Sequence, residues 1–438
     1  MAYARRARSR GRNADAHQAA GEVIELQDQE ATSMTDSTDT FVVSVPQSQL
    51  DDLKARLMGT RWPVDIDEHE TYYGTSIAFM KELVDYWIND FDWRAAETEI
   101  NTYDNHRVLV DGVPIHYLRE RGKGPAPIPL ILSHGWPWSF REWTKVVKPL
   151  ADPASYGGDP ADAFDVIVPS LPGFGFSTPI DRPDMNFWKM AELWHALMTE
   201  HLGFAKYAAG GADYGALITA QLGHANAAAL HGIWLGHPVH LDVFQGERPW
   251  DGTGGFMVPP GVPDEIRNGI LAFQYRYASH AAVHILDSQN LSLGLADSPV
   301  GMLAWILRRW TEWSDSDGDV ESVFPRDHLL ANATLWWVTN TITTSVRSYV
   351  NANRYPWQPS HDRVPIIEAP TGFTFLGFEN PPGVGTEDRV RVFLDDVRHK
   401  GWYNPVHLGA HDRGGHFTPW ENPEAVVEDI RATFRNLR

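Results

Sequence analysis

The stretch GGADYG at residues 210–215 decides how the rest of the sequence is interpreted. It follows the apolar run YAA at 207–209 and precedes the apolar pattern ALITAQLG at 216–223, so we expect a strand, a tight turn and a helix. The small residues around Asp213 allow that turn and place its side chain at the edge of a sheet. Many enzymes carry a nucleophilic serine on such an elbow. A carboxylate there is already ionised at neutral pH and attacks carbon without the help of a base.

Short apolar runs recur on both sides of this stretch, with helical patterns between them. The runs are PLILSHGW at 129–136, FDVIVPSLPGFGFS at 164–177, HGIWLGHP at 231–238, PTGFTFLGFE at 370–379 and NPVHLGAHDRGGH at 404–416. Such a series predicts an α/β fold with a mostly parallel sheet and helices on both faces. Active sites in these sheets lie at the carboxyl ends of the strands, where the quoted motifs lie. Before the first run, Asp111-Gly112 predicts the turn of a hairpin.

Composition and pattern divide the chain into five segments. Residues 1–39 are polar and aperiodic and are expected to be a disordered tail, within which Met34 is an alternative start. The helical pattern over 40–105 is amphipathic, so its apolar side must cover another part of the molecule. Residues 241–360 are helical without strand-like runs and are expected to be an inserted cap. The α/β core then consists of 106–240 and 361–438.

Charge and composition exclude several classes of protein. The net charge of −20 excludes a broad nucleic-acid surface, because phosphate binding needs Lys and Arg. The absence of cysteine excludes disulfides, thiolate catalysis and cysteine-bound metal, and is typical of the reducing cytoplasm, where we expect the protein. We expect neither a secretory signal nor a membrane anchor, because the basic first residues have no apolar stretch behind them and no long apolar run follows. The 18 Trp indicate an aromatic core or an aromatic-lined pocket.

An acid and a histidine follow Asp213 in the chain order that such a site requires, nucleophile, acid, histidine. His416, in DRGGHFTPW, comes after the last strand-like run, and Glu379 ends the run before it. Asp395 and Asp396 are rivals for the acid, but they lie in the pattern VRVFLDDVRHK, which predicts a helix whose acids are solvated. We therefore expect Glu379 to orient His416, as the acid does in a serine triad.

The stretch SHGWPWS at 133–139 supplies the remaining part of the site. Gly135 and Pro137 predict a turn directly after a strand. In that turn the backbone N–H of Trp136 is expected to point at the reacting oxygen, together with the N–H of Tyr214 after the nucleophile. These two donors would form an oxyanion hole.

These motifs together resemble one family. HGWP, LPGFGFS, GGADYG, FE and RGGHF, with TRWP near the amino terminus, are jointly similar to the α/β-hydrolase epoxide hydrolases of the microsomal and juvenile-hormone type, over about residues 40–435. The resemblance implies an α/β-hydrolase fold with a helical cap, like LADSPVGMLAWILRRWTEW, and an amino-terminal segment that wraps onto cap and core. It also implies that Asp213 is the nucleophile, His416 the water-activating base and Glu379 its acid partner.

The same resemblance implies two cap tyrosines that donate hydrogen bonds to the epoxide oxygen. Tyr349, 30 residues before Glu379, has the spacing of one of them. A gapless alignment puts His280 where the family has the other, and Tyr277 lies three residues earlier. We expect His280 and Tyr277 to line the substrate pocket. A histidine that donates the proton would make activity depend on a group titrating near pH 6 to 7.

Two further residues depart from the family pattern. Trp138 stands where a glycine usually follows HGWP, and is expected to narrow the pocket mouth or to cover the oxyanion turn. The elbow reads Ala-Asp-Tyr where Gly-Asp-Trp is common, and we expect no membrane anchor like that of the microsomal members.

The expected reaction is hydrolysis of an epoxide to a vicinal diol through an ester of Asp213, without metal or organic cofactor. We expect a small apolar or aromatic epoxide as substrate, and a homodimer stays open. The alternatives are a dehalogenase with the same Asp-His-acid site, an α/β-hydrolase repurposed in natural-product biosynthesis, and a binding protein that kept the pocket. The complete set of Asp213, Glu379 and His416 argues against the binding protein.

Overall fold

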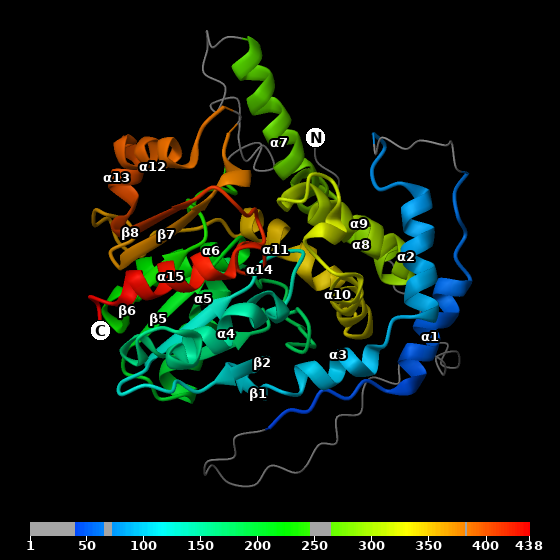
Figure 1. Ribbon diagram of the computed structural model, residues 1–438, viewed down its shortest axis with the longest axis horizontal. Helices are drawn as coiled ribbons and strands as arrows, with labels where there is room; N and C mark the ends of the chain where they lie inside the picture. The colour runs from blue at the N-terminus through cyan, green and yellow to red at the C-terminus, as the bar shows by residue number, and fades with distance from the viewer. Residues whose placement is uncertain (1–39, 65–71, 246–263, 382) are drawn as a thin grey trace, which may run out of the picture. The chain divides into compact units, whose positions relative to one another are not determined.

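The computed structural model describes residues 40–64, 72–245 and 264–438 except 382. The tail predicted over 1–39 lies outside the described residues. In the described residues, eight strands form one sheet in the order β1-β2-β4-β3-β5-β6-β7-β8 (Figure 1). The strands are β1 Asp104–Val110, β2 Val113–Glu120, β3 Ile128–Ser133, β4 Phe164–Pro169, β5 Tyr207–Gly211, β6 Leu230–Leu235, β7 Pro370–Leu376 and β8 Asn404–His411.

The sheet is mostly parallel, which confirms the predicted α/β-hydrolase fold. Strand β2 pairs antiparallel with β1 and with β4, and all pairs from β4 to β8 are parallel. The predicted hairpin is also confirmed: Val110 pairs with Val113 around the turn, where Asp111 has φ 48° and Gly112 has φ 76°. Positive φ at both central residues is typical of the tight turns that join antiparallel strands.

Alternating side chains of the central strands face two helical layers. Leu130 and Leu132 of β3 pack on one face with α4 (Thr144–Ala151) and α15 (Pro423–Phe434), and Ile131 between them packs on the other face. That other face is covered by α5 (Phe187–Ala196) and α6 (Tyr214–Ala225). The period of two is that of a strand buried on both sides, so both layers are core (Figure 1).

A helical region interrupts the α/β core between β6 and β7. It contains α7 Asp264–Leu286, α8 Ser288–Asp297, α9 Pro299–Trp313, α10 Arg326–Val338 and α11 Ile342–Arg354. Its chain position matches the inserted cap expected over 241–360, and we call these helices the cap; the segment boundaries given above stay predictions. Among the residues that the structure describes, no helix combines the length and the apolar character needed to cross a membrane.

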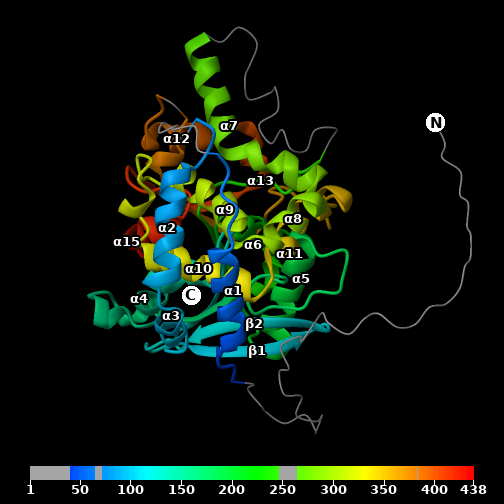
Figure 2. The same cartoon turned by 90° about the vertical axis from the view of Figure 1, so that its right-hand side faces the viewer.

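The amino-terminal helices pack against the cap. They are α1 Gln47–Met58, α2 Ile77–Asn89 and α3 Trp93–Ile100. Apolar residues of α1 and α2 join the same buried cluster as residues of α9 and α10, and the Trp87 indole N–H donates to Thr334 Oγ1 of α10 at 2.9 Å. Figure 2 shows α1 and α2 beside the cap helices. The amphipathic pattern near the amino terminus therefore reflects burial against the cap.

Candidate active site

Asp213 lies at the sharp turn between β5 and α6, where the sequence predicts the elbow. Its backbone has φ 51° and ψ −120°, a conformation that residues other than glycine rarely adopt. The turn passes so close to β3 that a Cβ on Gly215 would overlap the carbonyl oxygen of Ser133. A Cβ on Gly135 would lie 2.5 Å from the Asp213 Cβ. The small residues in both motifs thus let two strand ends meet at the carboxylate.

The Asp213 carboxylate is held by backbone amides on one side and by a histidine on the other. The N–H of Trp136 donates to Oδ1 at 2.7 Å, the Tyr214 N–H also hydrogen-bonds the carboxylate, and His416 Nε2 lies 3.3 Å from Oδ2. Burial raises the pKa of Asp213, but the contacts with His416 and with the two amides outweigh burial, so the net pKa is lowered. The predicted oxyanion donors are therefore beside the nucleophile.

His416 and Glu379 complete a chain of charges. Glu379 lies in the turn η8 (Gly377–Glu379) directly after β7, and its Oε1 is 3.0 Å from His416 Nδ1. Burial lowers the pKa of His416, but the contacts with Asp213 and Glu379 outweigh burial and raise it to about 10. Burial raises the pKa of Glu379, but His416 and other nearby cations lower it to about 2. The rivals Asp395 and Asp396 are exposed, which leaves Glu379 as the partner of His416.

The loop that carries His416 is tied to the cap. We call residues 412–421 the histidine loop and residues 313–315, at the end of α9, the cap turn. The N–H of His416 donates to the Trp313 carbonyl at 2.9 Å, and the N–H of Gly414 donates to Asp315 Oδ2 at 3.0 Å. In return, the N–H of Asp315 donates to Glu421 Oε2 at 2.7 Å. No pattern in the sequence indicates these contacts between residues about 100 positions apart.

The turn that carries Trp136 has its own buried supports. The Nδ1 of His134 contacts the Gly135 carbonyl at 2.9 Å, while its Nε2 accepts from the N–H of Leu171 at 3.1 Å. Glu142, in η1 (Phe140–Trp143), accepts from the Gly135 N–H through Oε2 at 3.3 Å, and burial raises its pKa to about 8. The sequence did not single out Glu142, because an acid seven residues after a motif carries no signal of its own.

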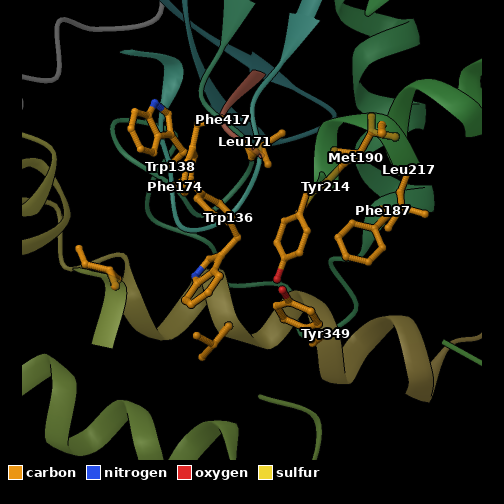
Figure 3. Packing of buried hydrophobic residues seen from close by; sticks show 14 of the residues in the cluster. Trp136, Trp138, Leu171, Phe174, Phe187, Met190, Tyr214, Leu217, Tyr349 and Phe417 are labelled. Carbon is orange, nitrogen blue, oxygen red and sulfur yellow. The ribbon is translucent and has the colours of Figure 1, made fainter. Parts of the chain in front are cut away.

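The cap supplies the opposite wall of the site. Tyr349 lies on α11, and its hydroxyl faces that of Tyr214, with ring centroids 5.0 Å apart (Figure 3). His280 lies on α7, and its Nε2 is 2.6 Å from the Tyr349 hydroxyl. The His280 ring also stacks on Trp136, with centroids 5.2 Å and planes 8° apart. Tyr349 and His280 thus meet above the oxyanion turn.

The remaining predicted pocket residues differ in where the structure places them. Tyr277 lies near His416: its ring centroid is 6.2 Å from the ring centroids of Trp313 and of His416. Burial, followed by nearby charges, lowers the pKa of His280 well below its usual value, so the prediction of a His280 titration near pH 6 to 7 is wrong.

Trp138, expected to narrow the pocket mouth or to cover the oxyanion turn, lies in a buried cluster of aromatic rings. Only 1% of its surface is exposed. It contacts five other rings, those of Trp310, Phe324, His328, Phe417 and Trp420. The motif HGWP therefore predicts the turn, but it does not predict the side of the turn on which the Trp138 ring packs.

Comparisons with known proteins identify the family to which this chain is similar. Residues 38–143 match the family described as epoxide hydrolase N terminus, and residues 128–274 match the alpha/beta hydrolase fold. A Stigmatella aurantiaca protein whose name places it among the epoxide hydrolases is 36% identical over 407 residues, covering 91% of this chain and 85% of that protein. Epoxide hydrolase 1 of Oryctolagus cuniculus is 28% identical, covering 89% of this chain and 87% of the relative.

Solved structures show the same fold. Juvenile hormone epoxide hydrolase of the silkworm Bombyx mori superposes with a TM-score of 0.71 at 22% identity, covering 91% of this chain and 94% of that one. The Aspergillus niger epoxide hydrolase gives a TM-score of 0.71 at 23% identity, covering 92% and 97%.

Proposed function

This chain belongs to the epoxide hydrolase family, and from that premise we propose that Asp213, His416 and Glu379 convert an epoxide to a vicinal diol through an ester of the enzyme. The observation that carries the proposal is the division of labour at one carboxylate. The backbone amide of Trp136 holds Asp213 Oδ1, and His416 lies beside Oδ2. The attack by Asp213 and the later hydrolysis of its ester are thus assisted from two sides of the carboxylate.

In the first step, Asp213 Oδ2 attacks an epoxide carbon. A new C–O bond forms, the strained C–O bond of the ring breaks, and the ring oxygen leaves as an alkoxide that needs a proton. Tyr349 supplies that proton from the cap wall. Its phenol faces the elbow: the ring centroids of Tyr349 and Tyr214 are 5.0 Å apart, and the charge of Asp213 raises the pKa of Tyr349.

Ester formation also prepares His416 for the second step. In the free enzyme two carboxylates hold the pKa of His416 at about 10, so the imidazole is protonated at neutral pH. The ester carries no negative charge, so one of these two carboxylate partners is lost and the pKa of His416 falls. The imidazolium then loses a proton to solvent, and the neutral imidazole, oriented by Glu379, can take a proton from water.

In the second step, the activated water attacks the Asp213 carbonyl carbon. The developing oxyanion on Oδ1 accepts from the N–H of Trp136, which already holds that oxygen in the free enzyme, and the N–H of Tyr214, which hydrogen-bonds the same carboxylate, is the second donor. The acyl C–O bond breaks, and the diol oxygen takes a proton from His416. The proton left on the new Asp213 carboxyl restores the Tyr349 phenol, and His416 takes a proton back from solvent as the charge of Asp213 returns.

We further propose an apolar or aromatic epoxide as substrate. The rings around Tyr349 support this, because Trp136, Phe244 and Tyr214 all lie within 6.3 Å of its ring centroid. Aromatic walls of this kind favour apolar ligands that carry a few polar atoms.

The test is a panel of epoxides, with styrene oxide first, and haloalkanes, scored by diol and halide release. Asp213→Ala serves as the inactive control. A single turnover of styrene oxide in ¹⁸O-water should place the label in the peptide that contains Asp213. Diol formation without label there would reject the ester, and halide release without diol would favour the dehalogenase.

A further inference from the structure

A short polar contact on the cap wall joins two buried side chains. His280 Nε2 lies 2.6 Å from the Tyr349 hydroxyl, and the two residues are 4% and 5% exposed. Three aromatic neighbours fix the His280 ring: it stacks on Trp136 and meets the rings of His284 and Trp313 at centroid distances of 5.1 and 4.9 Å. The ring nitrogen therefore has one direction in which to act, toward Tyr349.

Burial decides the charge state of His280. It lowers the pKa of the imidazole well below the usual value, so the ring is neutral and carries a single N–H. Its Nδ1 has no hydrogen-bond partner in the described part of the chain. A proton on Nδ1 would be a buried donor without an acceptor, which is costlier than an under-used lone pair. The Nε2–H form, by contrast, places its donor on the phenol oxygen.

Burial also creates the need for such a donor. It raises the pKa of Tyr349 well above 10, and the charge of Asp213 raises it further, so the phenol alone is a poor acid. A phenol oxygen accepts two hydrogen bonds and donates one. Donors that bind this oxygen stabilise the phenolate, and the Tyr214 hydroxyl already faces it (Figure 3).

We propose that His280 is a positioning residue for Tyr349: its Nε2–H donates to the phenol oxygen, stabilises the phenolate that forms, and leaves the phenol proton directed at the epoxide oxygen. This inference rests on the proposed epoxide opening. It assigns to His280 an action through Tyr349 in place of a direct donation to substrate. The cap wall then contains one acid with its support, where the family resemblance implies two equal donors.

The test is a double-mutant cycle on the rate of epoxide opening, measured as loss of styrene oxide in single turnovers with enzyme in excess. His280→Phe keeps the ring stacked on Trp136 and removes the N–H, while His280→Gln keeps a donor at the position of Nε2. We expect H280F to slow opening about tenfold, the cost of one hydrogen bond, and H280Q to stay within about threefold of wild type. In the Tyr349→Phe background, H280F should have no further effect.

Three outcomes would overturn the proposal. Equal slowing by H280F with and without the Tyr349 hydroxyl would show direct donation to the epoxide. Equal slowing by H280Q and H280F would show that only ring shape matters. A wild-type spectrum of ¹⁵N-labelled histidine with the His280 proton on Nδ1 would refute it without any turnover, and so separates its failure from failure of the proposed reaction.

Discussion

The active site has a core wall, with Asp213, His416 and Glu379, and a cap wall, with His280 and Tyr349. Both walls bury ionisable groups, but burial and pairing shift the pKa values in opposite ways. On the core wall, pairing outweighs burial: His416 has a raised pKa and Glu379 a lowered one. On the cap wall, burial outweighs pairing: the pKa of His280 is lowered and that of Tyr349 is raised. Charged groups for ester chemistry thus lie at strand ends, which are rich in backbone donors, while a helical wall of neutral rings handles the proton of the leaving oxygen.

The strongest test of this comparison removes the base from the core wall. His416→Gln should leave Asp213 able to attack the epoxide, but the ester that forms should not be hydrolysed, because the base that activates water is missing. We expect turnover to fall about 10³- to 10⁴-fold while the Asp213 ester accumulates to one per chain, measured by intact-protein mass spectrometry. The exposed His201 gives a matched control, His201→Gln, with wild-type turnover. Rapid steady turnover of H416Q would break the assignment.

The corresponding change on the cap wall should affect the other step. Tyr349→Phe removes the proton donor and should slow epoxide opening about a hundredfold, with a much smaller effect on hydrolysis of the ester. Rapid-quench measurement of the two steps separates them. Tyr355→Phe, just after the same helix, is the control. If both steps slowed equally, the two walls would not divide the reaction as we infer.

The stability of the protein should reveal the pairing on the core wall. The pKa of His416 is about 10 in the folded protein, above its value of 6.5 in an unfolded chain. Such a group stabilises the fold fully below pH 6.5, and this contribution is lost as pH rises through about 10. The free energy of unfolding of wild type relative to H416Q should therefore fall between pH 7 and 10, by on the order of a few kcal/mol. A pH-independent difference in urea unfolding would contradict the pairing.

Backbone strain is a further property of the core wall. Asp213 has φ 51°, whereas Tyr349 and His280 lie within α-helices. Asp213→Ala and Asp213→Gly both lose the carboxylate, but only glycine relieves the conformation. We expect D213G to be more stable than D213A by about 1 kcal/mol, the strain less the extra chain entropy of glycine. Chemical denaturation measures this, and D213G no more stable than D213A would show an unstrained elbow.

The smallest effect is expected away from both walls. Trp138 belongs to the core, and its buried indole N–H has no partner among the described residues. Trp138→Phe should therefore change kcat/KM by less than about threefold, because phenylalanine keeps an aromatic ring in the cluster and loses no hydrogen bond. A loss of kcat/KM above tenfold in a variant that circular dichroism shows to be folded like wild type would place Trp138 in the substrate pocket.

The sequence predicts the core wall well because each of its residues has a local signal. Asp213, Glu379 and Trp136 each follow an apolar run, and parallel strands bring their carboxyl ends together. The fold was predictable for the same reason, since alternating strand and helix patterns allow few topologies.

The cap wall could be predicted only through the family resemblance. His280 and Tyr349 lie 69 residues apart on two helices, and no periodicity of either helix specifies that they meet. The titration expected of His280 was wrong because burial, which sets its charge, depends on packing that the sequence does not specify. The role of Trp138 stays a prediction, because a motif predicts a turn but not the side of the turn on which a neighbouring ring packs.

The hydrogen bonds between the cap turn and the histidine loop limit how this enzyme can be recombined. Inserted caps are natural units to exchange between relatives, because both ends of the insertion leave the same sheet. Here an exchanged cap would also carry the partners of Gly414 and His416, which are Asp315 and the Trp313 carbonyl. A chimera that takes its cap from one parent and residues 412–421 from another would combine a cap turn and a histidine loop from different proteins. Successful crossovers should therefore inherit both segments from a single parent.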